Sequence, residues 1–228
     1  GLTSAQAQII SETQWFFGRS AANLQFDKNG VNVYEEERMN PSFGLGGSAV
    51  ISNPYNGNLL FYSDGQRIYD ASHNDILPST ASFTGNPDIN QAVVAMPHPA
   101  DSAQYYLFVN NENSVHFALL DATRQGNGNG QVPFGEVTAT GDLGIPNPSE
   151  GMIIVPNVTG TTYWLITQNR NTYDFSVTQV DGTGLGFTRT FALDTSTQIP
   201  GFEAAQFDFN SDSSLLAVAP KDPNRNIL

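Results

Sequence analysis

The sequence contains no cysteine, and this absence excludes several kinds of protein at once. Without thiols the chain forms neither a disulfide scaffold nor a thiolate metal site, and it has no cysteine nucleophile. Basic residues are also scarce, because 9 Lys and Arg stand against 22 Asp and Glu, a formal net charge of -13. Since so acidic a surface repels phosphate groups, we expect no binding to nucleic acid.

Long hydrophobic runs are missing as well. No apolar run approaches the roughly 20 residues that a transmembrane helix needs, so we expect no membrane insertion. The chain nevertheless has 15 Phe, 8 Tyr and 2 Trp among its 228 residues, which is enough to build a core. With 21 Gly and 13 Pro, the composition predicts frequent turns between short strands.

The N-terminus carries a weak export pattern. Ala5-Gln6-Ala7 has the small-x-small form that ends a bacterial signal peptide. We therefore interpret residues 1–13 as a tail that retains part of such a signal, the alternative being an ordinary flexible terminus.

One hairpin pattern recurs along the chain. Residues 56–70, NGNLLFYSDGQRIYD, combine an apolar strand, an Asp-Gly turn and a second strand. Asp64-Gly65 favours a hairpin because both residues tolerate the positive φ of a type I′ turn. Similar strand-turn-strand segments begin at Gly47, Asn90, Glu150 and Glu203. Intervals of about 40 to 60 residues fit the blades of a β-propeller with loop insertions.

The predicted fold is therefore all-β, a β-propeller of repeated antiparallel blades. About four to five blades are visible, which indicates an incomplete ring or a fragment of a longer protein. The units are 14–46, partial and lacking a first strand, then 47–89, 90–149, 150–202 and a truncated 203–228. Within the insertion 121–149 we expect a fourth strand near residues 135–140. A smaller closed form or a β-sandwich is the alternative.

Catalytic motifs are not apparent in the sequence. His73, His98 and His116 lie in different repeats without metal-ligand spacing. The glycine-rich stretch 44–48 precedes a strand, so it lacks the helix N-terminus that would hold a phosphate. The acids fall mostly in predicted turns, at Asp64, Asp70, Asp88, Asp121, Asp142, Asp181 and Asp208. Turn formation explains them without catalysis.

One segment resembles a calcium loop. Asp208, Asn210 and Asp212 present alternate side-chain oxygens, a pattern that can coordinate a hard cation. An EF-hand would need Gly and an acid where this chain has Ser213 and Ala219, so the segment is not an EF-hand. We interpret the segment as a simple turn between two strands, with calcium binding as the alternative; the sequence indicates no other cofactor.

Two positions are candidates for glycosylation. Asn157-Val158-Thr159 is an N-x-T sequon, which matters only in a glycosylating host. Asp101-Ser102-Ala103 resembles the acceptor pattern for O-glycosylation in Bacteroidetes, which makes Ser102 the second candidate.

Several motifs together resemble one family. Trp15-Phe16-Phe17-Gly18, followed by Ala21, Leu24 and Phe26, is similar to the W-[YF]-F-G-x-x-A-x-L-x-F opening of large exported proteins of the Bacteroidetes. The likeness continues through residues 49–52, 57–65, 69–70, 77–78, 91–94 and 105–108. The resemblance implies an N-terminal propeller, export by type IX secretion and a link to gliding motility, and it implies no catalytic residues.

These observations predict a non-catalytic, exported binding or adhesion module at the cell surface of a Gram-negative bacterium, or outside the cell. Its partner would be a surface glycan or protein. Two alternatives stay open. The chain could be a component or cargo of a type IX secretion or motility assembly, or a polysaccharide-active enzyme that uses paired carboxylates.

Overall fold

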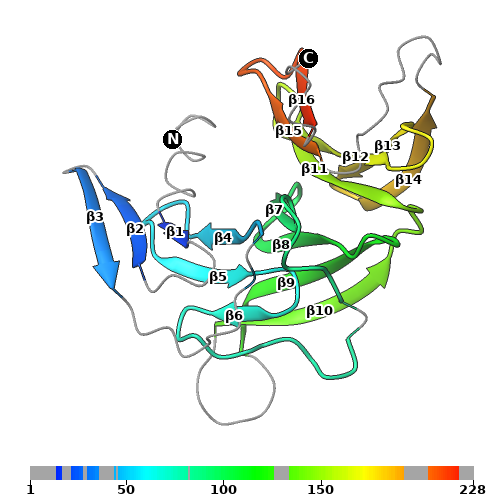
Figure 1. Ribbon diagram of the computed structural model, residues 1–228. Coiled ribbons are helices and arrows are strands. Elements are labelled where there is room, and N and C mark those ends of the chain that lie inside the picture. Colours follow the sequence, from blue (N-terminus) through cyan, green and yellow to red (C-terminus); the bar gives the residue numbers. More distant parts are fainter. Residues whose placement is uncertain are drawn as a thin grey trace.

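All regular structure in the described residues is β-strand. The computed structural model (Figure 1) describes residues 14–16, 22–27, 30–35, 44, 46–81, 83–125, 134–192 and 205–220. Within these ranges sixteen strands form five antiparallel sheets, and no residue lies in a helix. The predicted all-β class is confirmed. The predicted N-terminal tail, 1–13, lies outside the described residues.

Each sheet is a meander, in which strands adjacent in the chain pair with each other. The first sheet contains β1 (Gln14–Phe16), β2 (Ala22–Asp27) and β3 (Gly30–Glu35), and the second contains β4 (Ala49–Ser52), β5 (Leu59–Ser63) and β6 (Ile68–Asp70). The third contains β7 (Val93–His98), β8 (Asp101–Asn110), β9 (Val115–Gln125) and β10 (Phe134–Asp142). The fourth contains β11 (Pro148–Pro156), β12 (Thr162–Asn169), β13 (Phe175–Asp181) and β14 (Gly184–Phe191), and the fifth contains β15 (Ala205–Phe209) and β16 (Leu216–Pro220). The fourth strand predicted near residues 135–140 is confirmed as β10, whereas the unit boundaries stay a prediction.

Successive sheets meet through their first strands. β1 contacts β4, β4 contacts β7, β7 contacts β11, and β11 contacts β15. Figure 1 shows the sheets following one another along an arc, from the blue first sheet to the red strands of the fifth. Gln14–Phe16 thus has the position of a first strand, where the sequence predicts that the first unit has none.

The buried clusters lie between consecutive sheets. Leu107 and Val109 of β8 join one cluster with Phe61 of β5, while Phe108 joins another with Leu165 of β12. Because neighbouring β8 residues point to opposite faces, both faces of this strand are buried. Burial on two sides explains why residues 105–109 of β8 form an uninterrupted apolar run instead of an alternating one.

The hairpin around Asp64 is confirmed, but its predicted type I′ turn is wrong. Residues 64–67 connect β5 to β6, and of these only Gly65 has a positive φ, +92°. Asp64 Oδ1 accepts hydrogen bonds from the N–H groups of Gln66 and Arg67, at 2.9 and 3.0 Å. The aspartate therefore stabilises a four-residue connection through its side chain. Asn111 and Asn169 accept the same two bonds in the third and fourth sheets, as expected for repeated turns.

A second turn repeats toward the end of the third strand in the second, third and fourth sheets. Asp70, Asp121 and Asp181 each begin an Asp-[Ala/Gly]-[Ser/Thr] triplet. Each carboxylate accepts the N–H of the residue two positions later, at 2.8 or 2.9 Å. Because an accepted N–H bond favours the charged carboxylate, the turns at Asp121 and Asp181 couple local structure to ionisation.

We predict that acid destabilises the protein through these turn carboxylates. The hydroxyl of Thr123 lowers the pKa of Asp121, and the hydroxyl of Thr183 does the same for the pKa of Asp181. Burial would raise the pKa of Asp142, but the Ser114 hydroxyl, the Gly144 N–H and the charge of His116 outweigh it and the pKa is lowered.

The direction of this pH dependence follows from the folded-state pKa values, which are lower than the ordinary aspartate value. The stabilisation is fully present above the ordinary aspartate value of 3.8 and is lost as the pH falls through the folded-state values. Urea unfolding between neutral pH and about pH 3 should show a falling free energy of unfolding. D121N should lower the stability at neutral pH and flatten this dependence, and an unchanged slope would contradict the assignment.

Candidate functional site

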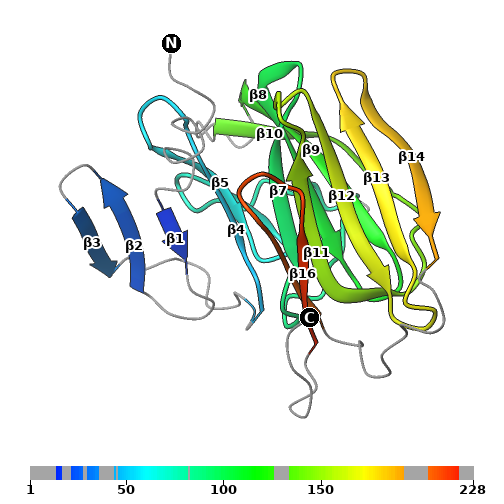
Figure 2. The ribbon, with the colours of Figure 1, turned by 90° about the horizontal axis from the view of Figure 1, so that it is seen from above.

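Figure 2 shows β4 of the second sheet beside β7 of the third. A cleft lies between these two sheets, at the end that carries the β4–β5 connection. Its volume is about 640 Å³, within the range of small-ligand sites. Amide side chains come from Gln14, Asn53, Asn56 and Asn58, and hydroxyl groups come from Tyr55, Ser102, Tyr105 and Thr123. Pro54, Leu59, Leu60, Ala71, Ala103 and Ala122 complete the lining.

The long β4–β5 connection creates the cleft. It spans residues 53–58, and Asn53 organises it: its N–H donates to the Asn58 carbonyl at 2.7 Å and its Oδ1 accepts the Tyr55 N–H at 2.9 Å. Gly57 closes the turn at φ +72°, where a side chain would be strained. Gln14 Nε2 donates to the Gly57 carbonyl at 3.2 Å, so a side chain of β1 helps to hold the loop in place.

The equivalent place between the third and fourth sheets is narrower. Only residues 99 and 100 connect β7 to β8, and a methyl group built on Gly182 would lie 3.3 Å from Ala100 Cβ. In this pair of sheets the short connection approaches the turn after β13 closely. The cleft therefore forms because the connection between the first two strands is longer in the second sheet than in the third.

Two tyrosines give the cleft its aromatic character. Tyr105 is only 5% exposed and meets Phe61 edge to face, with ring centroids 5.2 Å apart. Burial raises the pKa of the Tyr105 hydroxyl, and the neighbouring Tyr55 raises it further, so the group stays neutral. Tyr55 itself is 77% exposed, which leaves its ring accessible to a ligand.

The wall from the third sheet supplies hydroxyl groups. The Thr123 hydroxyl donates to Asp121 Oδ1 at 2.6 Å, so its remaining capacity is to accept a hydrogen bond. Ser102 is exposed on β8 and lines the same cleft, which places this predicted O-glycosylation residue at the candidate site. None of the described residues that line the cleft is Asp, Glu, Lys, Arg or His.

The predicted calcium residues lie in the connection between β15 and β16. Asn210 Oδ1 accepts the N–H groups of Ser214 and Leu215, at 2.9 and 2.8 Å, and Asp212 Oδ1 accepts the Ser214 N–H at 3.0 Å. Asp208 Oδ1 accepts the N–H of Phe209 at 2.8 Å. The three side chains thus take part in turn hydrogen bonds, and calcium binding stays a prediction.

Asn157 has the same place in the fourth sheet that Asn210 has in the fifth. Its Oδ1 accepts the N–H groups of Thr161 and Thr162, at 3.0 and 3.3 Å. Its Nδ2, the atom that would carry an N-linked glycan, donates to Thr161 Oγ1 at 3.4 Å. The sequon is therefore part of a β-hairpin turn, and its use stays a prediction.

The other predicted chemical groups are separate from one another. His73 Nδ1 contacts the Tyr62 hydroxyl at 3.0 Å, His98 Nδ1 accepts the Ala100 N–H at 3.2 Å, and His116 Nε2 contacts Asn111 Nδ2 at 3.0 Å. Within the part of the chain that the structure describes, no three His, Asp or Glu residues form a group that could hold a metal ion. The same part contains no helix long and apolar enough to cross a membrane.

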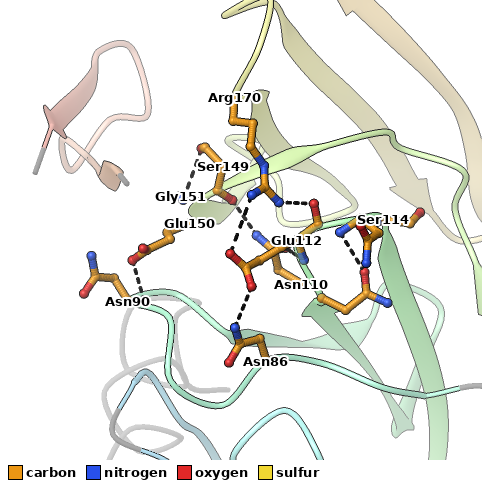
Figure 3. A network of polar contacts seen from close by, with 11 residues as sticks. Asn86, Asn90, Asn110, Glu112, Ser114, Ser149, Glu150, Gly151 and Arg170 are labelled. Carbon is orange, nitrogen blue, oxygen red and sulfur yellow. Dashed lines mark hydrogen bonds and ion pairs between the residues drawn. The ribbon is translucent and has the colours of Figure 1, made fainter. Parts of the chain in front are cut away.

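A polar network joins the β8–β9 connection to its neighbours (Figure 3). It lies at the end of β8 opposite to the cleft residue Ser102. Glu112 is its centre: Asn86 Nδ2 donates to Glu112 Oε2 at 2.7 Å, and Arg170 Nη1 lies 3.6 Å from Glu112 Oε1. Arg170 Nη2 also donates to the Glu112 carbonyl. Glu112 has φ +67°, a strained backbone for a residue with a side chain. Its three contacts connect three separate loops.

We predict that E112A lowers the free energy of unfolding by about 1–2 kcal/mol, because it removes the charge-assisted hydrogen bond from Asn86 and the ion pair with Arg170. E112G should cost less than E112A, since glycine relieves the positive φ while losing the same bonds. Urea unfolding of E112A, N86A and the double variant checks this. The sum of the losses in free energy of unfolding for the two single variants should exceed the loss for the double variant. Strict additivity would contradict a shared network.

No protein-family model matches the sequence, and a search of curated proteins finds no match.

Proposed function

We propose that the chain is part of a β-propeller and acts as a non-catalytic binding module of an exported bacterial protein, at the cell surface or outside the cell. Five sheets that follow one another through their first strands support the propeller arrangement. The motif likeness in residues 14–108 to exported Bacteroidetes proteins supports the surface location, type IX export and the link to gliding.

The cleft between the second and third sheets is the observation that carries the binding role. It combines an exposed tyrosine ring with amides and hydroxyls on a rigid scaffold of strands, which is the usual composition of a ligand site. The lining offers no carboxylate pair for hydrolysis among the described residues. Binding is therefore favoured over the alternative of a polysaccharide-active enzyme.

We predict that Y55A weakens binding to bacterial surface polysaccharide or surface protein by at least about tenfold, because the ring is the largest accessible apolar group of the cleft. The matched control is V158A: Val158 is 98% exposed on the β11–β12 connection and lies outside the lining. Retention on columns carrying each fraction measures the effect. Equal retention of wild type and Y55A would contradict a role for the cleft.

A role as a component or cargo of a secretion or motility assembly is the second candidate. β14 is an edge strand among the described strands, and it exposes Phe187 at 94% and Phe191 at 54%. These rings extend the sheet face whose inner part, at Ile153 and Val155, packs on the fifth sheet. A strand from an assembly subunit is the occupant that suits this site, because it would pair with the edge of β14 while its apolar side chains cover the two rings. A monomer with β14 amides protected from hydrogen exchange would contradict it.

A further inference from the structure

We propose that the cleft binds an uncharged glycan built from pyranose sugars, with a sugar ring stacked on Tyr55. This inference rests on the proposed binding role of the cleft and names its ligand class. It is carried by the chemistry of three features: a lining without charge, an exposed aromatic ring, and amide and hydroxyl groups on facing walls.

The absence of charge in the lining argues against an ionic ligand. An anionic or cationic group buried in the cleft would lose water without gaining a counter-charge from any described lining residue. The formal net charge of -13 further disfavours uronate-containing or sulfated glycans. Asp121 is close in sequence to the lining residue Thr123 but does not line the cleft itself. Its carboxylate is already bound by Thr123 and Arg124.

The hydrogen-bonding groups match neutral hydroxyls. Asn56 Oδ1 accepts the Asn58 N–H at 3.0 Å, which fixes the amide and leaves its Nδ2 as a donor. Thr123 Oγ1, having donated its proton, acts as an acceptor on the opposite wall. Sugar hydroxyls both donate and accept, so neighbouring hydroxyls of one ring suit donors on one side and acceptors on the other.

The aromatic ring provides the apolar contact that a sugar requires. One face of a pyranose presents C–H groups, which pack on the π face of an aromatic ring. Tyr55 offers that face at 77% exposure, whereas the other lining tyrosine, Tyr105, is buried. A volume of about 640 Å³ suits roughly two or three sugar units.

The test is calorimetric titration of neutral gluco-, manno- and galacto-oligosaccharides against wild type, Y55F, Y55A and V158A. Matched oligosaccharides containing uronate or sulfate groups are titrated alongside them, at low and high salt. At least one neutral series should bind, with affinity independent of salt. The charged counterparts should be at least about tenfold weaker. Y55F should stay within about threefold of wild type and Y55A should lose about tenfold or more, because stacking needs the ring.

The outcomes separate this inference from the proposed function. Tighter binding of the charged series, or a salt-dependent affinity, would overturn the uncharged-glycan assignment. Tyr55-dependent retention of surface protein without binding of any neutral series would also overturn it, while the binding role would stand. If neither oligosaccharides nor surface fractions bind, both proposals fail. Circular dichroism of the variants establishes that each is folded.

Discussion

Replacing Gly46 with alanine should lower the free energy of unfolding by about 3 kcal/mol or more, since the added methyl group has no space. A Cβ built on Gly46 would lie 1.9 Å from the carbonyl oxygen of Ile89, an atom of the backbone. Gly46 N donates to the Pro87 carbonyl at 2.8 Å and Gly47 N donates to the Ile89 carbonyl at 3.1 Å. These bonds hold the segment before β4 directly against the segment before β7, so relief requires separating the second and third sheets.

Gly160→Ala is the matched control for G46A. Gly160 has φ +68° and nothing within 4 Å of a built Cβ, so the alanine variant should cost only about 1 kcal/mol from backbone strain. Urea unfolding of both variants measures the difference. Equal losses would contradict the close backbone approach, and a G46A protein that fails to fold while G160A folds would agree with it.

Gln91→Leu should destabilise the protein by about 3 kcal/mol, because the substitution leaves three backbone groups without their partner. Gln91 Oε1 accepts the N–H of Met152 at 3.0 Å and the N–H of Phe207 at 2.9 Å, and Gln91 Nε2 donates to the Phe207 carbonyl at 3.0 Å. Met152 and Phe207 are buried, so water replaces these bonds poorly. One side chain thus connects the third sheet to the first strands of the fourth and fifth.

Hydrogen exchange distinguishes this link from a general loss of packing. In Q91L the amides of β15 should exchange faster than those of β9, because the fifth sheet loses its bond to the third while β9 keeps its own pairing. Gln66→Leu is the control, since Gln66 is exposed in the turn after β5. A Q91L protein as stable as Q66L would contradict a central role for the Gln91 side chain.

Local patterns in the sequence predicted the strands well. The run at residues 105–109 and the turn at Asp64 both specify structure through neighbouring residues, and both are found as hairpins. The turn type was wrong because the Asp64 side chain accepts two N–H bonds and stabilises a longer connection. Gly44, Gly46 and Gly47 gave no such local pattern, since a side chain at each would meet the backbone of residues 87–90, which are distant in the sequence.

The cleft could not be predicted in the same way. Its walls come from Tyr55 in one repeat and from Ser102 and Thr123 in the next, and they meet only when the second and third sheets pack. One sequence feature does point to it: residues 53–58 form a longer connection than residues 99–100 at the equivalent place. Comparing connection lengths between repeats would have indicated where the spacing between sheets widens. The ligand class could be inferred only from the complete set of residues that line the cleft.

The most direct test of the account is to locate the bound ligand by hydrogen exchange, with and without a saturating surface-polysaccharide fraction. We predict protection at residues 53–58, 101–105 and 122–123, which form the two walls of the cleft. The turns around Glu112 and Arg170, at the opposite end of the sheets, should be unchanged. Protection confined to those turns, or to the exposed face of β14, would contradict the cleft as the binding site.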